Sequence, residues 1–180
     1  MVGKVLPQSA STEKLRQSPN VSPPTCAFPV ALWHDSVSVT SNAPLLKGGH
    51  PTALTLMEAN RMIQAALAKA QELNVKISVA VCDTGGNLVA LNRMDGAIAV
   101  SAMVAQGKAA ASAGFGRASG TLPADSPVLQ AVIAAHGGRM LPAQGGVPVV
   151  KSSELVGAIG ASGATAEQDE QCAQAGAAII

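Results

Sequence analysis

The sequence predicts an α+β domain in which helices pack on a mainly antiparallel sheet. Two pairs of apolar runs are each joined by a short turn, which is the pattern of a β-hairpin, and a hairpin cannot be built from parallel strands. Segments with apolar residues three and four apart, typical of amphipathic helices, stand before, between and after these pairs. A chain of 180 residues is long enough for one domain with its own core. The expected order of elements is therefore α-β-β-α-α-β-β-α.

The first helix is predicted to begin after Thr55. Thr55 and Glu58 have the spacing of a capping box, in which the hydroxyl caps an amide of the first turn and the carboxylate binds the amide of the cap residue. The residues that follow form one apolar stripe at helical spacing. Its members are Leu56, Ala59, Ile63, Ala66, Leu67, Ala70 and Leu73.

The first hairpin comes next. Residues 76–82 alternate between polar and apolar, as a half-buried strand does. Residues 83–87, with the sequence DTGGN, have the composition of a turn, and residues 88–91 resume as a strand.

Two helices separate this hairpin from the second one. An alanine-rich helix is predicted over residues 99–113. Ser126 followed by Pro127 is an N-cap with proline at the first helical position, which opens a short helix that Gly137 and Gly138 end.

The last third of the chain repeats the hairpin-and-helix pattern. The second hairpin is predicted from apolar strands over 147–150 and 155–159. Thr165 and Gln168 then form another capping box and begin a final helix that ends at about Ala178.

Residues 1–50 differ from the rest of the chain. They are rich in Ser, Pro and Asn and show no sustained hydrophobic period. We therefore predict a flexible or peripheral N-terminal extension over 1–50 and one folded domain over 51–180. The hydroxyl-rich, acid-poor composition leaves organelle targeting by this extension open, although no Arg-rich amphipathic pattern supports it.

The composition argues against several classes of partner. The net charge of +1 gives no electrostatic reason to expect nucleic acid or an anionic membrane, and Phe28, Trp33 and Phe115, the only aromatic residues, offer no stacking platform. No apolar run approaches the roughly 18 residues of a membrane-spanning helix, and no secretory signal is present. The three cysteines are scattered without CxxC spacing, which argues against a disulfide framework or a zinc site. We expect no metal ion and a reducing, cytoplasmic location.

Two groups of glycines mark the first candidate ligand site. Gly145 and Gly146 stand directly before a predicted strand, and Gly157, Gly160 and Gly163 lie along and just after the next one. Missing side chains permit a turn, a bulge, or close approach by another backbone or by a ligand. A simple turn explains the first two glycines, and a wall of a ligand cleft is the alternative. We predict a hollow beside the curved sheet at these glycines.

Five polar residues near apolar structure are the other candidates for ligand binding. They are Asp83, Arg93, Asp95, Lys108 and His136. Asp83 can instead cap a turn, and Arg93 can pair with Asp95 rather than with a ligand carboxylate. His136 suits the C-terminus of a helix. Lys108 either extends to solvent or points into a cleft as a counter-charge.

Three acids, Glu167, Asp169 and Glu170, cluster at the start of the last helix. The helix dipole is a sufficient explanation for them, and a bound cation or a neighbouring subunit is the alternative. No nucleophile elbow or catalytic triad can be assembled from the spacing. The residues alone therefore predict a small domain with a cleft and no mechanism.

Several motifs together resemble one known family, the GlcG/HbpS-like proteins. These are also called haem-degrading or DUF336 proteins and occur as the C-terminal part of PduO-type corrinoid adenosyltransferases. The motifs span about residues 52–180 in the order and spacing of the family. They are LTLMEANRMI (54–63), VAVCDTGGNL (79–88), RMDG (93–96), KA (108–109), GFG (114–116), GGVP (145–148), VGAIGASG (156–163), EQDE (167–170) and CA (172–173).

The resemblance implies a helix-backed antiparallel sheet of the PAS or profilin kind and assembly into symmetric homo-oligomers. It also implies, for some members, binding of haem or another tetrapyrrole. If haem binds, His136, Met140 or Met103 are the available axial ligands. Some haem-binding relatives place a threonine shortly after the helix lysine, where this chain has Ala111, which cannot bind iron.

Three functions follow from the residues and the resemblance. The favoured one is a haem- or tetrapyrrole-binding accessory protein. The second is an enzyme acting on a small organic acid or carbonyl compound, in which Arg93 or Lys108 binds carboxylate and Asp83 or Asp95 moves a proton. The third is an oligomeric scaffold without a ligand.

Overall fold

The structure, a computed structural model of the chain, describes residues 53–180. The predicted order of helices and strands is confirmed, and the short 3-10 turn η2 is added to it. The predicted extension over 1–50 lies outside the described residues, so this boundary stays a prediction. The elements are α1 (Leu56–Glu72), β1 (Ser78–Cys82), β2 (Leu88–Arg93), α2 (Ser101–Phe115), η2 (Ser119–Thr121), α3 (Pro127–Ala135), β3 (Gly146–Lys151), β4 (Glu154–Ser162) and α4 (Ala166–Ala177).

The four strands form one antiparallel sheet in the order β2-β1-β4-β3. Both predicted hairpins are confirmed, as the outer pairs β1–β2 and β3–β4. The central pair joins the hairpins, with Ser78 opposite Ser162 and Cys82 opposite Ala158. Because β1 and β4 are far apart in the sequence, no local signal predicted this pairing.

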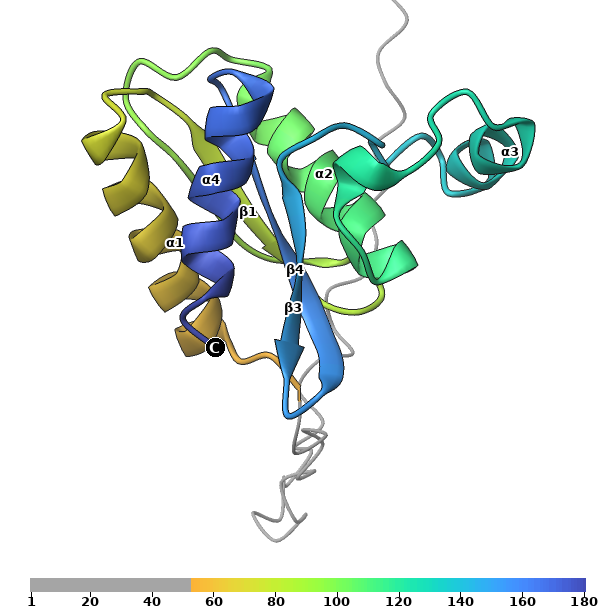
Figure 1. Cartoon of the computed structure of the whole chain (residues 1–180), viewed down its shortest axis with the longest axis horizontal. Helices are drawn as coiled ribbons and strands as arrows, with labels where there is room; N and C mark the ends of the chain where they lie inside the picture. The colour runs from red at the N-terminus through yellow and green to blue at the C-terminus, as the bar shows by residue number, and fades with distance from the viewer. Residues whose placement is uncertain (1–52) are drawn as a thin grey trace, which may run out of the picture. The chain divides into compact units, whose positions relative to one another are not determined.

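Helices cover both faces of the sheet, so the domain has three layers (Figure 1). Helices α1 and α4 lie side by side on one face, and α2 lies on the other. The predicted capping boxes form at the start of α1 and α4, where Thr55 and Thr165 accept hydrogen bonds from the amides of Glu58 and Gln168. The caps satisfy amides that have no partner inside the helix.

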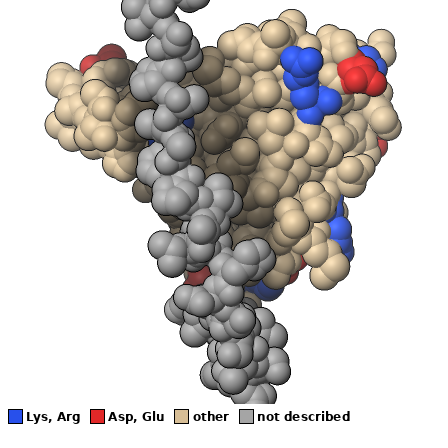
Figure 2. All heavy atoms as spheres, turned by 180° about the vertical axis from the view of Figure 1, so that it is seen from behind, with Lys and Arg blue, Asp and Glu red and all other residues tan. Residues whose placement is uncertain are grey.

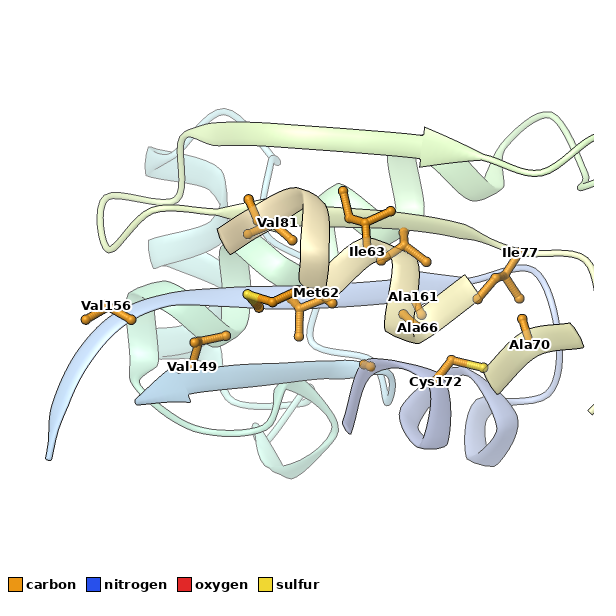
Figure 3. Packing of buried hydrophobic residues seen from close by; sticks show 14 residues of the cluster. Met62, Ile63, Ala66, Ala70, Ile77, Val81, Val149, Val156, Ala161 and Cys172 are labelled. Atoms are coloured by element: carbon orange, nitrogen blue, oxygen red, sulfur yellow. The ribbon is translucent and has the colours of Figure 1, made fainter. Parts of the chain in front are cut away.

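The main core lies between the sheet and the α1–α4 pair (Figure 3). Met62 and Ile63 of α1 and Cys172 of α4 are fully buried against the strands. Alternate residues of β1, Val79 and Val81, join this core because successive side chains of a strand point to opposite faces.

The other face of the sheet is covered by the small residues of α2, and here the expected hollow is absent. A Cβ at Gly160 would lie 2.7 Å from the backbone nitrogen of Ala109, and one at Gly146 would collide with the carbonyl of Lys108. The glycines therefore let the backbone of α2 lie directly on β3 and β4. The prediction of an open hollow beside Gly145 and Gly146 was wrong, because the protein's own helix fills that space.

The face of the domain shown in Figure 2 is formed largely by uncharged residues, with Lys, Arg, Asp and Glu in small, separate groups. Within residues 53–180, no helix is both long and apolar enough to cross a bilayer. In the same part of the chain, no three His, Cys, Asp or Glu side chains gather as metal ligands would.

Candidate ligand-binding site

A groove of about 290 Å³ runs along the side of α2 that faces away from the sheet. Three segments that are far apart in the sequence form its walls: α2, the β1–β2 turn and the chain after α3. The lining residues are Gly86, Met103, Val104, Gln106, Gly107, Ala110, Gly138, Arg139 and Leu141. The walls are thus mostly apolar or bare backbone, and none of the described lining residues is a carboxylate.

A small recess adjoins the groove and shares part of its wall. It adds Gly85, His136 and Met140 to the shared residues. Met103, on the groove wall, is 69% exposed, whereas Met140 is buried beneath the recess. The three residues expected as axial ligands of haem therefore surround one continuous depression.

The β1–β2 turn is held in place by Asp83. Its Oδ1 accepts hydrogen bonds from the amides of Gly85 and Asn87, each at 2.9 Å. Gly86 has a φ of +74°, and a Cβ on it would lie 3.6 Å from the Cβ of Ala110 in α2. The turn conformation and the tight approach to α2 both favour glycine here.

The opposite wall is fixed to α2 by its backbone. The amide of Leu141 donates to the carbonyl of Gly107 over 2.9 Å. Helix α3 ends as predicted, with Gly137 and Gly138 at φ of +66° and +72° and their amides bonded to the carbonyls of Ala134 and Ile133.

His136 stands at the C-terminal end of α3, as expected. Its Nδ1 lies 3.0 Å from the carbonyl oxygen of Val132. Because a carbonyl only accepts, Nδ1 carries a hydrogen, and in the neutral imidazole Nε2 is then the nitrogen with the lone pair. The ring is exposed, so Nε2 is available to a ligand.

Arg139 is a site residue that sequence reasoning missed. It is exposed, lines both the groove and the recess, and makes no ion pair with any residue in 53–180. Its position three residues after His136 and directly after two turn-forming glycines was the signal that could have identified it.

Lys108 lies neither in solvent nor in the groove. It is 5% exposed and Asp169 is 3% exposed, and Lys108 Nζ donates to Asp169 Oδ2 over 2.8 Å and to the carbonyl of Ala161 over 3.0 Å. Asp169 Oδ1 also accepts from the amide of Ala164. Gly145 packs on this ion pair, since a Cβ there would lie 2.8 Å from Nζ. The two alternatives expected for Lys108 were therefore both incorrect, and Asp169 has a specific partner beyond the helix dipole.

The remaining predicted site residues lie elsewhere. Arg93 and Asp95 are exposed at the end of the edge strand β2, with no ion pair between them and no place in the lining of the groove. Asp83 supports the groove through its turn while its side chain lines a different hollow of about 590 Å³, which it shares with Thr84 and Glu154.

A hollow of about 760 Å³ lies on the exposed face of α1. Its lining residues are Leu56, Met57, Asn60, Arg61, Gln64 and Ile179. It is larger than the groove but shallow, and it contains no histidine, so we regard the groove as the candidate site.

The buried thiols are structural rather than reactive. Burial raises the pKa of Cys82 to about 12, with a smaller contribution from the charge of Asp83, and burial also raises that of Cys172 to about 11. At about pH 8, near the ordinary pKa of a thiol, we expect iodoacetamide to leave both cysteines unmodified in the native protein and to modify both in urea. Peptide mass spectrometry measures this, and rapid native modification of Cys172 would contradict the burial.

The fold and the groove together define a class, namely small α+β domains with helices on both faces of a four-stranded antiparallel sheet and an apolar surface groove bordered by histidine and arginine. Within this class the chain belongs to the HbpS-like family. The family model described as "Haem degrading protein HbpS-like" matches residues 54–178. The resemblance inferred from the motifs is thus confirmed.

Individual relatives agree with this assignment. GlcG of Escherichia coli K12 is 38% identical over 110 residues, which are 61% of this chain and 81% of GlcG. The crystal structure of a double mutant of Streptomyces reticuli HbpS is 33% identical, has a TM-score of 0.64, and matches 73% of this chain and 90% of that one. The crystal structure of a PduOC–haem complex is 29% identical, also with a TM-score of 0.64, over 71% of this chain and 95% of that one.

Proposed function

We propose that this protein binds haem or a related tetrapyrrole in the groove beside α2. The observation that carries the proposal is His136, whose Nδ1–Val132 hydrogen bond leaves Nε2 as an open electron-pair donor at the edge of an apolar groove. The similarity to HbpS and to the haem-bound PduOC structure supports the choice of ligand.

The groove fits a flat apolar ligand. Gly86, Gly107 and Gly138 present backbone without side chains, while Val104 and Leu141 offer apolar contact. At about 290 Å³ the groove is at the lower end of the roughly 300–1,000 Å³ of small-molecule sites. It would therefore hold one edge of a macrocycle and leave the rest outside a single chain.

The histidine geometry fits haem iron. A neutral imidazole whose other nitrogen donates to a carbonyl is the form that binds a metal, and this hydrogen bond also orients the ring. Bound haem would supply an iron that accepts such a nitrogen as an axial ligand. The chain's contribution is to orient the ring through the Nδ1–Val132 hydrogen bond, so that Nε2 is the nitrogen left for a ligand.

Titration with haemin tests the proposal. We expect a Soret shift that saturates near one haemin per chain, and we expect His136→Ala to lose the shift without losing the fold. Met57→Leu, which changes an exposed methionine in the separate hollow on α1, is a matched control that should keep it. An unchanged spectrum and affinity in His136→Ala would overturn this site.

The enzyme and scaffold alternatives have less support. Of the residues suggested for organic-acid or carbonyl chemistry, Lys108 is buried and paired with Asp169, and Asp83 holds its own turn. Arg93 and Asp95 are exposed together at the end of β2, away from the lining of the groove.

Self-association and a cytoplasmic location are further parts of the proposal. Exposed apolar side chains near the start of α2 and on α3, among them Ile98, Val100 and Val128, support contact with a second copy. The unpaired thiols of Cys82 and Cys172 are consistent with a reducing compartment. Light scattering of the purified chain tests self-association. A monomer at micromolar concentration would contradict that part of the proposal.

A further inference from the structure

Among residues 53–180, Arg139 is the only Lys or Arg that lines the groove. The ion pairs of residues 53–180 involve Lys69, Lys108 and Lys151, so the guanidinium of Arg139 has no carboxylate partner in the described part of the chain. No Asp or Glu of the described residues lines the groove or the recess, so no carboxylate of this part of the chain offsets its charge there.

The flanking backbone fixes the position of Arg139, whereas most N–H donors of its guanidinium make no hydrogen bond to the described residues. Its Nε donates one long bond, of 3.4 Å, to the carbonyl of His136. A guanidinium carries five N–H donors in a planar fork, so the Nη groups can still bind both oxygens of a carboxylate. The flanking backbone is held by Gly138 and by the Leu141–Gly107 hydrogen bond.

The surroundings of Arg139 favour one kind of ligand group. Met103, Val104 and Ala110 make the adjacent wall apolar, and an ion pair next to apolar surface is screened less than one in open water. A ligand with an apolar body and an acidic side group matches both features, with the body against α2 and the acid on Arg139.

We infer that Arg139 binds a carboxylate of the ligand, so that the groove selects acid-bearing tetrapyrroles over their esterified or uncharged counterparts. This inference rests on the proposed function and adds the chemical class of ligand within it. It assigns Arg139 a role in specificity that is separate from the coordination of iron by His136.

The test compares haemin with haemin dimethyl ester, which retains the iron and loses both carboxylates. Each is titrated into the wild-type protein, Arg139→Gln and Arg61→Gln. Arg61 is the matched control, because it is an exposed arginine without an ion pair in the described residues and lines the separate hollow on α1. Arg139→Lys keeps the charge and loses the planar fork.

The wild-type protein and Arg61→Gln should bind haemin about tenfold more tightly than the ester, the size expected for a partly exposed charged hydrogen bond. In Arg139→Gln the haemin-to-ester affinity ratio should fall about tenfold, and in Arg139→Lys it should fall by less. The greater apolarity of the ester affects every variant alike, so the change in the haemin-to-ester affinity ratio between variants isolates the contribution of Arg139.

The same haemin-to-ester affinity ratio in the wild-type protein and in Arg139→Gln would overturn the inference while leaving haem binding intact. Absence of saturable binding of either ligand would instead remove the proposed function, and the inference with it.

Discussion

Replacing Asp169 by asparagine is expected to lower the free energy of unfolding by about 3–5 kcal/mol, because it leaves the ammonium of Lys108 buried without a counter-charge. Lys108 is 5% exposed, and its other hydrogen bond reaches only the carbonyl of Ala161. A buried charge that loses its partner keeps its full desolvation cost. Urea unfolding of the two proteins, followed by circular dichroism, measures the difference.

Two controls separate the ion pair from other effects at this helix. Glu167→Gln removes an exposed carboxylate from the same first turn and should change stability by no more than about 0.5 kcal/mol. The double variant Lys108→Met, Asp169→Leu removes both charges, so it should be more stable than Asp169→Asn alone. If the double variant were the less stable of the two, the loss would come from packing rather than from an unpaired charge.

Gly160→Ala is expected to destabilise the domain by about 3 kcal/mol and to weaken haemin binding. The new methyl group would meet two backbone atoms of α2, the carbonyl oxygen of Ala105 and the nitrogen of Ala109. Backbone cannot rotate away as a side chain can, so α2 must move off the sheet. Because α2 forms one wall of the groove, the same movement displaces Met103 and Ala110 from the ligand.

Gly114→Ala is the matched control for this substitution. It lies in α2 itself, and its added methyl would meet only the flexible tip of Met140, at 2.8 Å from Cε. Alanine also favours the helix over glycine by up to about 1 kcal/mol. We therefore expect Gly114→Ala to be neutral or stabilising. An equal loss of stability in both variants would show that the close approach of α2 to Gly160 does not explain the effect of Gly160→Ala.

The elements of the fold could be predicted because their signals are local. Thr55 with Glu58 and Thr165 with Gln168 mark helix starts within four residues, and Gly137 with Gly138 ends α3 within two. The pairing of β1 with β4 depends on contacts between distant parts of the domain. The hydrophobic period therefore predicted each strand but could not predict that these two lie side by side in the centre of the sheet.

The site was predicted less well, for the same physical reason. Lys108 and Asp169 are 61 residues apart, and spacing alone does not show that they meet. A missing side chain permits close approach by a ligand or by the protein's own backbone equally, and at Gly146 and Gly160 the backbone of α2 takes the space. Arg139 could be recognised as a site residue only from the structure, because three segments that are distant in the sequence form the groove around it.

Hydrogen–deuterium exchange with and without haemin tests most directly whether the tetrapyrrole occupies the groove. The expected result is slower exchange in peptides that cover residues 103–110 and 136–141, with little change in peptides that cover residues 56–64 of α1. Protection confined to α1, with the groove unchanged, would contradict the assignment of the ligand to this site.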